Sequence, residues 1–468
     1  MNNISFGTDG WRAIIAKDYT FDNLSVIAQA TGRWITDEEI TNNGVVIGYD
    51  ARFMSREFAE HIASVFAAME IPVRMSSSIS PTPAVSWAAL HYNAVGIVIT
   101  ASHNPPNYNG YKIKAPFGGS ATPDQVAAVE KRLSDYDDSL DVRRFDEYLK
   151  LGLIREISLT EQYLNVLRQK IDIDAIQKSG LRIGHDTMFG SGMGAIKKLL
   201  GDQVFELHAE VNPSFKGTPP EPIEKNLQEF SEFITQNNCQ IGIANDGDAD
   251  RVGLIDETGA FVDSHRILSL LVKYLNREKG LTGKIVKTFS TTNMLNKQAE
   301  AYGLPIETTP IGFKYIAEKI ISEDVLAGGE ESGGMSVKGH IPERDGLYIG
   351  LVVTEMLVKT GKKLSELVSE LFDEFGNHAY YRNDLHTEEN KKLAMIEYCE
   401  SGKLTTINGI DVINREFIDG IKHHLADGSW LLVRPSGTEP VLRIYSEAAT
   451  AEQAKNLVDD VSAKVDDM

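Results

Sequence analysis

Short apolar runs rich in β-branched residues alternate with segments of helical period along most of this chain. The clearest runs are residues 44–50, 96–100, 181–186, 240–246 and 284–288. Alternating strands and helices are typical of α/β layers in which most strands of a sheet are parallel. In such layers, ligands usually bind in loops at the carboxyl ends of the strands. The pattern therefore predicts an α/β fold, with the chemistry in the residues that follow each run.

The chain has 468 residues, and at roughly 100–200 residues per domain this length suggests three or four domains. The C-terminal part has a different pattern. Residues 430–433 and 441–445 are typical of a hairpin pair, and a closing helix opens with Thr450 and has Gln453 at capping-box spacing. We expect a smaller α+β domain there.

Acidic residues outnumber basic ones by 67 to 47, so the formal net charge is −20 at pH 7. Because nucleic-acid affinity depends on clusters of basic residues, we expect no nucleic-acid partner.

No targeting segment is recognisable, and the apolar run 347–358 contains Glu355 and is shorter than the ~20 residues that cross a bilayer. Cys239 and Cys399 cannot build a disulfide framework. We expect a cytoplasmic protein with no membrane partner.

Residues 245–251, Asn-Asp-Gly-Asp-Ala-Asp-Arg, are the most informative segment. Asp246, Asp248 and Asp250 alternate, so in an extended or looped backbone their carboxylates can point one way. Three such oxygens suit Mg²⁺ more than zinc. An acidic turn is one alternative, and an EF-hand is another, although Arg251 stands where its turn requires glycine. Clustered like charges are costly without a cation, so we expect a metal site.

Residues 100–112, Thr-Ala-Ser-His-Asn-Pro-Pro-Asn-Tyr-Asn-Gly-Tyr-Lys, follow an apolar run. Ser102 beside His103 suggests a hydrolase, but the chain contains no GxSxG elbow. The paired prolines and the Asn-Gly pair favour a rigid loop that presents Ser102 at a strand end. If this loop lies beside a metal site, a Ser102 that carries a phosphate explains the segment better than a loop with no chemical role.

Three further segments offer groups for a phosphorylated sugar. Residues 434–440, with Arg443 on the next strand, combine a guanidinium, hydroxyls and glycine N–H groups into an anion cradle, unless they form an ordinary hairpin turn. Residues 6–12 end in Arg12 after a flexible turn. Residues 328–334, Gly-Gly-Glu-Glu-Ser-Gly-Gly, offer carboxylates and a hydroxyl that vicinal sugar hydroxyls would need.

One segment competes with this interpretation. Residues 190–195, Gly-Ser-Gly-Met-Gly-Ala, follow a strand and open a helix, with Glu210 near the distance of a ribose-binding acid. These features match the dinucleotide fingerprint and would make the protein an oxidoreductase. The fingerprint explains none of the other segments, and small residues at such turns are common for packing reasons.

Taken together, the five segments at 6–12, 100–112, 246–251, 328–332 and 434–440 resemble the α-D-phosphohexomutase family, which includes phosphoglucomutases and phosphomannomutases. They occur in the family's order and at its spacing. The resemblance implies an α/β protein of four domains around a central cleft. We place three αβα layers at 1–145, 146–254 and 255–370, and an α+β phosphate-binding domain at 371–468.

The resemblance also implies roles for residues at matching positions. Ser102 is similar to the phosphoserine that donates and regains the phosphoryl group, with His103 beside it. The metal ligands would be Asp246, Asp248, Asp250 and a phosphate oxygen on Ser102. Arg12 and Lys112 would be active-site cations and are our candidates for handling the hydroxyl proton. The implied substrate contacts are Arg251, Lys314, Glu330, Ser332, Arg434, Ser436, Gly437, Thr438 and Arg443.

The implied reaction moves a phosphoryl group between the 1- and 6-positions of a hexose through a bisphosphorylated sugar. Mg²⁺ would be the cofactor and a hexose 1,6-bisphosphate the activator of a monomer or dimer. Gly333 and Gly334 follow Ser332 where many mannose and glucosamine enzymes have a histidine, and Glu331 stands where the glucosamine enzymes usually have Gln. We therefore favour glucose phosphates, with mannose, glucosamine or pentose phosphates as alternatives. A non-catalytic phosphosugar-binding protein is the alternative from a different class.

Overall fold

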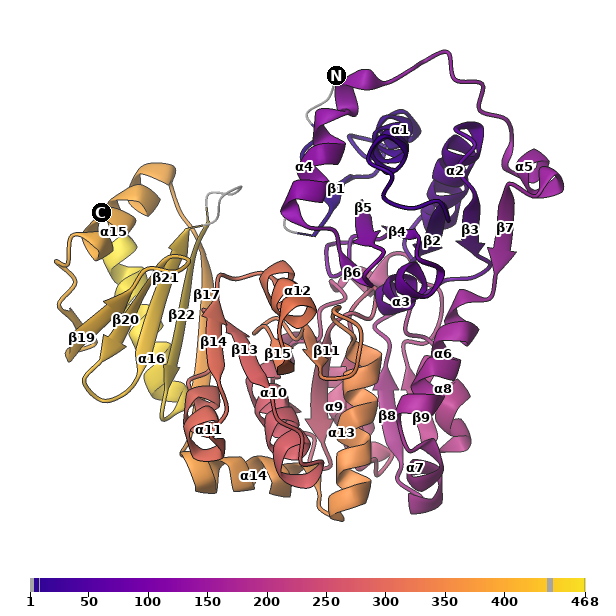
Figure 1. Ribbon diagram of the computed structural model, residues 1–468. Coiled ribbons are helices and arrows are strands. Elements are labelled where there is room, and N and C mark those ends of the chain that lie inside the picture. Colours follow the sequence, from indigo (N-terminus) through magenta and orange to yellow (C-terminus); the bar gives the residue numbers. More distant parts are fainter. Residues whose placement is uncertain (1–3, 8, 436–440, 467) are drawn as a thin grey trace.

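The computed structural model describes residues 4–7, 9–435, 441–466 and 468. Its strands form four sheets that follow one another along the chain, and each sheet is flanked by helices (Figure 1). The first three sheets are mixed, whereas the fourth is wholly antiparallel. Three α/β layers and a C-terminal α+β domain confirm the predicted fold class.

The first sheet has the order β1-β5-β4-β2-β3-β7, with β6 paired to β5. β2 is apolar throughout and buried on both faces: Val45 and Ile47 pack with α1 and α2, whereas Val46 packs with α3. The strands are β1 (Trp11–Ile14), β2 (Val45–Tyr49), β3 (Val73–Ser76), β4 (Val95–Ile99), β5 (Tyr108–Ala115), β6 (Gly119–Ser120) and β7 (Ile154–Ile157). The helices are α1 (Phe21–Asp37), α2 (Ser55–Ala68), α3 (Thr82–Tyr92), α4 (Pro123–Lys131) and α5 (Phe145–Leu151).

The second sheet has the order β12-β11-β10-β8-β9, in which β8, β9 and β10 are parallel. Its strands are β8 (Ile183–Asp186), β9 (Val204–Leu207), β10 (Ile241–Asn245), β11 (Val252–Asp256) and β12 (Phe261–Val262). Its helices are α6 (Leu159–Lys170), α7 (Ile173–Ser179), α8 (Ala195–Leu200) and α9 (Gln228–Gln236). The predicted limits at 145 and 254 both precede strands, β7 and β12, that pair with the preceding sheet.

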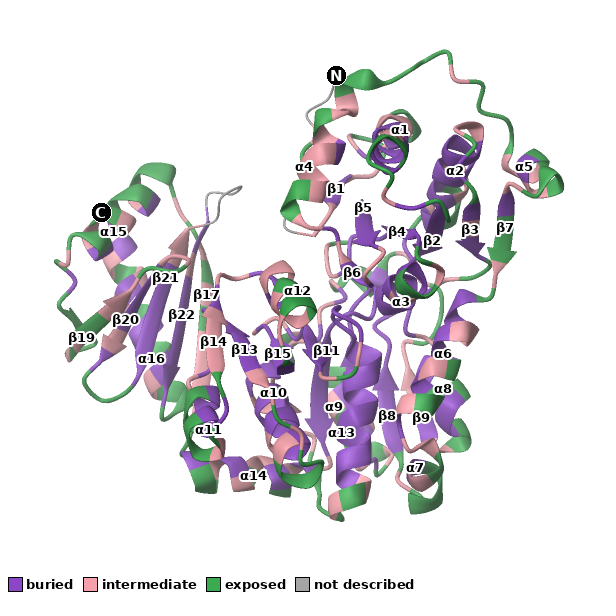
Figure 2. Cartoon of the chain, viewed as in Figure 1, coloured by how far each residue is buried: buried purple, intermediate pink, exposed green. Residues whose placement is uncertain are grey.

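The third sheet has the order β14-β13-β15-β16. Its strands are β13 (Lys284–Thr288), β14 (Ile306–Thr309), β15 (Val325–Gly329) and β16 (Met335–Val337), and its helices are α10 (Ser264–Lys273), α11 (Met294–Tyr302), α12 (Phe313–Ser322), α13 (Gly346–Thr360) and α14 (Leu364–Phe375). Figure 2 shows that α13 is buried along most of its length. Gly350 lets α13 approach Ile243 of β10, because a Cβ there would lie 2.7 Å from Ile243 Cγ2.

The fourth sheet has the order β17-β22-β21-β20-β19-β18. Its strands are β17 (Ala379–His386), β18 (Thr406–Ile407), β19 (Ile410–Glu416), β20 (Ile421–Leu425), β21 (Trp430–Pro435) and β22 (Val441–Ala448), and its helices are α15 (Glu389–Glu400) and α16 (Ala451–Asp466). β21 and β22 form the predicted hairpin. Thr450 Oγ1 accepts a hydrogen bond from the Gln453 N–H at 3.2 Å, as its capping position predicts.

The hydrophobic cores show how the parts are joined. One continuous core runs from α3 of the first layer through the second layer into the third. The C-terminal domain has a core of its own, and a small cluster of Phe289, Trp430, Leu432 and Tyr445 connects it to the third layer. Within the described part of the chain, the structure contains no helix that is both long and apolar enough to span a membrane.

Candidate active site

Ser102 lies in the serine loop (residues 100–107), which follows the carboxyl end of β4. The residue is 1% exposed and has φ 53°, a left-handed conformation that costs free energy and persists only when neighbours impose it. Arg52 supplies that restraint, because its guanidinium donates to the carbonyl oxygens of Ser102 at 2.6 Å, Asn104 at 2.5 Å and Pro105 at 2.8 Å. The Ser102 N–H donates to Thr100 Oγ1 at 2.9 Å.

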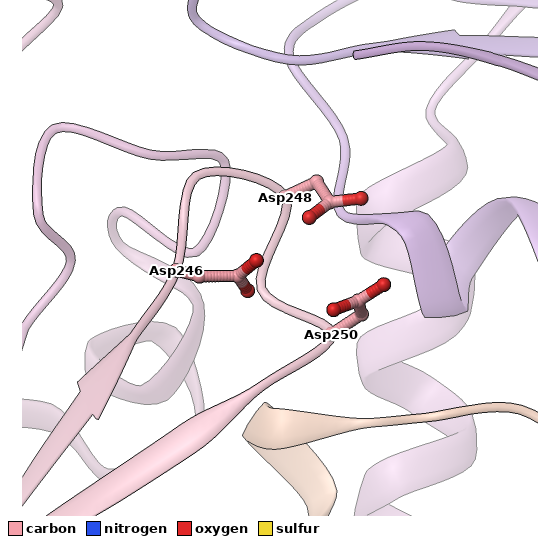
Figure 3. A group of neighbouring side chains, drawn as sticks. All are labelled: Asp246, Asp248 and Asp250. Carbon is pink, nitrogen blue, oxygen red and sulfur yellow. The ribbon is translucent and has the colours of Figure 1, made fainter. Parts of the chain in front are cut away.

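The metal loop (residues 246–251) connects β10 to β11 and gathers three fully buried carboxylates (Figure 3). One ligand oxygen from each of Asp246, Asp248 and Asp250 lies within 4.8 Å of the other two. Asp248 Oδ1 and Asp250 Oδ1 are buried and have no hydrogen-bond partner among the described residues. Unpaired buried carboxylate oxygens of like charge fit a hard divalent cation such as Mg²⁺. The flanking elements are strands, so the loop is not an EF-hand.

The serine loop and the metal loop come from different layers and are in direct contact. Ser102 Oγ donates to Asp246 Oδ2 at 2.7 Å, and Thr82 Oγ1 at the start of α3 donates to Asp248 Oδ2 at 2.5 Å. Gly247 permits this approach, because a Cβ there would lie 2.4 Å from the carbonyl oxygen of Ser102. The predicted nucleophile therefore lies against the predicted metal ligands.

The glycine-rich segment 190–195 supports the metal loop from behind. The Ser191 N–H donates to the carbonyl oxygen of Gly247 at 2.9 Å. A Cβ at Gly190 would lie 2.8 Å from the carbonyl oxygens of both Asp246 and Gly247. The small residues are thus explained by close packing against the metal loop, which removes the reason for proposing a dinucleotide site.

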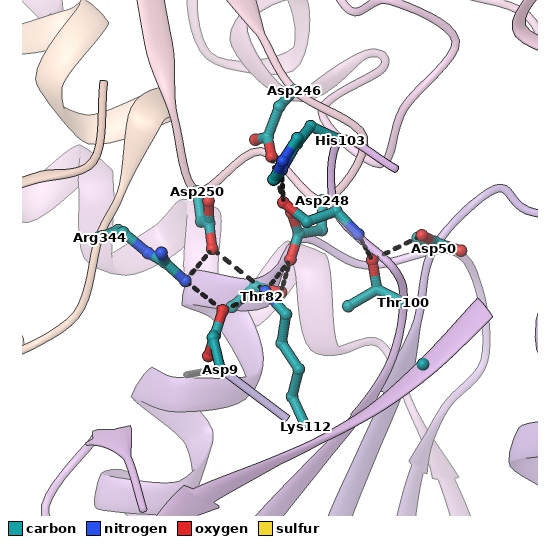
Figure 4. A network of polar contacts seen from close by, with 12 residues as sticks. Asp9, Asp50, Thr82, Thr100, His103, Lys112, Asp246, Asp248, Asp250 and Arg344 are labelled. Carbon is teal, nitrogen blue, oxygen red and sulfur yellow. Dashed lines mark hydrogen bonds and ion pairs between the residues drawn. The ribbon is translucent and has the colours of Figure 1, made fainter. Parts of the chain in front are cut away.

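Two cations on neighbouring segments hold the carboxylates (Figure 4). Lys112 Nζ of β5 lies 2.8 Å from Asp248 Oδ2, 3.3 Å from Asp250 Oδ2 and 2.8 Å from Asp9 Oδ2. Arg344, just before α13, also pairs with Asp9 and lies 2.7 Å from Asp250 Oδ2. The N-terminal segment, the metal loop and the start of α13 are therefore joined by one buried ionic network.

Burial and neighbouring charges shift the pKa values of the carboxyl groups at the site. Burial and the neighbouring charges of Asp248 and Asp250 raise the pKa of Asp246 well above its usual value. Burial alone would also raise the pKa of Asp248, but the Lys112 ammonium outweighs it and lowers that pKa.

The imidazole of His103 also has a shifted pKa. Burial and the charges of Arg251 and Arg12 lower the pKa of its imidazole well below the usual value. This shift favours the neutral form of the ring, and its Nδ1 lies 3.3 Å from Ser102 Oγ.

The sugar loop (residues 330–334) turns between β15 and β16. The Glu330 N–H donates to the carbonyl oxygen of Gly334 at 3.0 Å, and Gly333 takes φ 93°, which favours glycine. Glu330 is buried, and this burial raises the pKa of its carboxyl to about 7. Glu330 Oε2 lies 3.7 Å from Arg344 Nη1, so the ionic network reaches this loop, whereas Ser332 is half-buried.

The predicted basic residues of the site come from separate parts of the fold. Arg12 and Arg251 lie near the serine loop, where Arg12 Nη1 donates to Asn104 Oδ1 at 2.7 Å and the Arg251 N–H donates to Asp246 Oδ1 at 3.0 Å. Lys112 lies with them. Arg434 and Arg443 face each other across β21 and β22 in the C-terminal domain.

The remaining predicted contacts are less closely tied to the site. Arg434 Nε lies 2.9 Å from Asp419 Oδ1, and Arg443 Nε lies 3.9 Å from Asp384 Oδ2. Lys314, on α12, lies over the ring of Tyr315 and makes no recorded contact with another predicted site residue in the described part of the chain. Ser436, Gly437 and Thr438 lie outside the described residues.

Three residues that organise the site were not predicted from the sequence: Asp9, Arg52 and Arg344. Asp9 lies inside the segment 6–12. Arg52 follows the carboxyl end of β2, and this place after a predicted strand could have indicated it. Arg344 had no such signal, because its partners Asp9 and Asp250 lie far away in the sequence.

Replacement of Arg344 by Met should lower the melting temperature by about 5–15 °C, since removing one partner from a buried charge network costs roughly 3–5 kcal/mol. The control is Arg56→Met, which removes exposed ion pairs with Glu60 and Glu156 and should cost about 0–1 kcal/mol. Thermal unfolding monitored by circular dichroism measures both. Equal small shifts for the two variants would contradict the structural role of Arg344.

Family models match nearly the whole chain. Those of phosphoglucomutase/phosphomannomutase match α/β/α domain I at residues 3–139, α/β/α domain II at 161–259, α/β/α domain III at 263–375 and the C-terminal domain at 388–464.

Individual relatives match from end to end. The phosphoglucomutase/phosphomannomutase of Thermococcus kodakarensis is 32% identical over 458 residues, which cover 97% of this chain and 96% of the relative. A "probable phosphoglucosamine mutase" of Pyrococcus abyssi is 30% identical and covers 99% of this chain and 98% of its own length. The crystal structure of a "putative phosphomannomutase" from Thermus thermophilus superposes with a TM-score of 0.86 at 32% identity, covering 99% of each chain. The chain therefore belongs to the phosphoglucomutase/phosphomannomutase family, the α-D-phosphohexomutases, and is an enzyme of the mutase class of isomerases.

Proposed function

We propose that this enzyme interconverts the 1- and 6-phosphates of a hexose through a phosphoserine at Ser102. The observation that carries the proposal is the contact of Ser102 Oγ with Asp246 inside the buried cluster of three aspartates. In the forward half of the reaction, the bond between phosphorus and Ser102 Oγ breaks and a bond to the oxygen of the free sugar hydroxyl forms. The proton of that hydroxyl ends on Ser102 Oγ, which is left as a free serine. The bisphosphorylated sugar then turns, and its other phosphoryl group returns to Ser102.

The chain's own residues position and stabilise the transferring group. Asp246, Asp248 and Asp250, with a phosphate oxygen on Ser102, would hold Mg²⁺, which when bound neutralises charge on the phosphoryl oxygens. Arg52 fixes the serine loop, so little reorganisation is needed at the moment of transfer. Burial of Ser102 excludes water that would otherwise accept the phosphoryl group.

Lys112 and Arg12 remain our candidates for the residues nearest the hydroxyl proton. The Lys112 ammonium is surrounded by three carboxylates, which outweigh the effect of burial and raise its pKa. A lysine that holds its proton this tightly stabilises negative charge better than it accepts a proton. We therefore propose charge stabilisation as the main role of Lys112.

Substrate binding is proposed at two places. Glu330 and Ser332 would grip adjacent hydroxyls of the sugar, with Arg251 and Lys314 as further contacts. Arg434 and Arg443 would bind the phosphate that is not being transferred, together with Ser436, Gly437 and Thr438. A hexose 1,6-bisphosphate would prime the enzyme by phosphorylating Ser102.

The preferred sugar is better supported as mannose or glucosamine than as the glucose that the sugar loop suggests. The related proteins carry the names phosphoglucomutase/phosphomannomutase and phosphoglucosamine mutase. Glu331, one basis for the glucose preference, accepts a hydrogen bond from Ser290 Oγ at 2.6 Å and lies 3.9 Å from Arg382 Nη1. Because this carboxylate is engaged with protein groups, it is a weak discriminator between sugars.

The phosphoserine can be tested by intact mass. Incubation of the purified enzyme with glucose 1,6-bisphosphate should add one phosphate to the chain, and Ser102→Ala should abolish both this gain and turnover. Ser134→Ala, an exposed serine on a distant turn, serves as the control. A phosphate gain that persists in Ser102→Ala would overturn the proposal.

The contact between the two loops can be tested with a single methyl group. Gly247→Ala should lower kcat by about tenfold or more, because overpacking against the backbone of Ser102 costs roughly 1–3 kcal/mol and displaces the metal ligands from Ser102 Oγ. Gly192→Ala is the matched control, since its Cβ would meet Ala249 and Leu347 at ordinary distances of 3.4 and 3.6 Å. Steady-state kinetics should leave Gly192→Ala near wild type. Equal activities of the two variants would argue against the required close approach.

Substrate choice can be measured by a coupled assay across the 1-phosphates of mannose, glucosamine, glucose and ribose. We expect the highest kcat/KM for mannose or glucosamine 1-phosphate and the lowest for the pentose. A clear preference for glucose 1-phosphate would support the inference drawn from the sugar loop. A preference for the pentose would contradict both that inference and the expected preference for mannose or glucosamine.

A further inference from the structure

A cavity of about 610 Å³ lies between the third layer and the C-terminal domain. It is bordered by β13, α11, β20 and β22, at the boundary seen in Figure 1. Its polar lining includes Lys287, Lys422, Asn296, His378, His424 and Ser429. None of its lining residues belongs to the site around Ser102.

Two buried lysines on this lining lack a carboxylate partner. Lys287 and Lys422 are each 2% exposed. Among the described residues, Lys287 Nζ donates only to neutral oxygens, such as the carbonyl oxygen of Thr292 at 2.8 Å. Lys422 Nζ lies 4.1 Å from the ring centroid of Trp430 and 4.6 Å from that of Phe289, and has no recorded hydrogen bond or ion pair within the described ranges. Buried ammonium groups normally have an anionic partner.

The acidic groups on the same lining are already engaged by other donors. Glu447 Oε1 accepts from the Asn293 N–H at 3.0 Å and from Trp430 Nε1 at 3.1 Å, and it also lies 3.0 Å from His378 Nδ1. Glu416 pairs with His424 at 3.0 Å.

Asp427 is engaged in the same way. It accepts from the Ser429 N–H and hydroxyl and from Gln453 Nε2. The two lysines are therefore the groups of this lining that a ligand would satisfy.

Burial outweighs the charges of Glu447 and Glu416, which alone would raise the pKa of both lysines. Burial lowers the pKa of Lys287 to about 8. Burial and the charge of Lys287 lower the pKa of Lys422 to about 7. An anion near both Nζ atoms would favour their charged forms.

Residues next to the cavity are connected to both segments that are proposed to contact substrate. Lys287 Nζ donates to the carbonyl oxygens of Thr291 and Thr292, and Ser290 of the same turn donates to Glu331 in the sugar loop. On the other side, Trp430 begins β21, the strand that carries Arg434. A molecule in this cavity would therefore bridge the third layer and the C-terminal domain.

We propose that the cavity binds a small multivalent oxyanion between Lys287 and Lys422, as a site separate from the substrate site. The anionic group is either a phosphate or the carboxylates of a small organic acid. Either chemistry supplies several acceptor oxygens to two ammonium groups and to the amide and hydroxyl donors around them.

The position of the anion can be observed directly. Crystals soaked in sodium selenate should show an anomalous peak within hydrogen-bonding distance of Lys287 or Lys422 Nζ. Selenate peaks confined to the region of Arg434 or to the surface, with none in the cavity, would overturn the proposal.

The solution test uses thermal-shift titrations of the full-length enzyme with sodium phosphate and, separately, sodium citrate, at matched ionic strength. Saturable stabilisation by one probe and not the other identifies the oxyanion chemistry. Asn296→Asp adds a negative charge at an exposed position on the lining, so it should fold normally and raise the half-saturating concentration of the effective probe by about fivefold or more.

The matched control is Asn165→Asp on α6, an exposed position far from the cavity, which should leave the half-saturating concentration unchanged. The double variant Lys287→Met/Lys422→Met should abolish this stabilisation. Equal titrations of wild type, Asn296→Asp and the double variant would contradict the site, whatever the outcome of the phosphoserine experiment.

Discussion

The structure of the active site depends on the burial of three aspartates in one loop. Each carboxylate removed from water needs compensation, and in this chain Lys112 and Arg344 provide part of it. Asp248 Oδ1 and Asp250 Oδ1 have no hydrogen-bond partner among the described residues, and a cation could occupy the space beside them. Because the compensating groups come from the first layer and from the start of α13, the ionic network also fixes how the layers meet.

The sequence predicted those parts of the fold in which one short segment forms one strand. The apolar runs at 44–50, 96–100, 240–246 and 284–288 form β2, β4, β10 and β13, since a run that is apolar on both faces is stable only between two layers of helices. The extent of each layer was harder to predict. β7 and β12 are short strands at sheet edges, and only their pairing partners assign them to a sheet.

Some residues of the candidate site could be named from the sequence, and others could not. Ser102 and the three aspartates stand out because they follow strand ends, and Lys112 was named through the family resemblance. The structure brings these five residues together. Arg344 and Arg52 look like ordinary surface cations in a sequence of 468 residues. Their importance comes from partners on other elements, and a pairing of this kind leaves no local pattern. The site residues named from the sequence therefore did not include these two cations.

The contact between Ser102 and Asp246 joins residues that are 144 positions apart and belong to separate sheets. Neither layer alone supplies both residues of this contact, so it can form only after the second layer has been synthesised, folded and docked. During synthesis, domains generally fold in order from the N-terminus. The nascent first layer then exposes a serine that has no metal ligands beside it. The phosphoserine proposed at Ser102 would then form only in a chain whose first two layers are already docked.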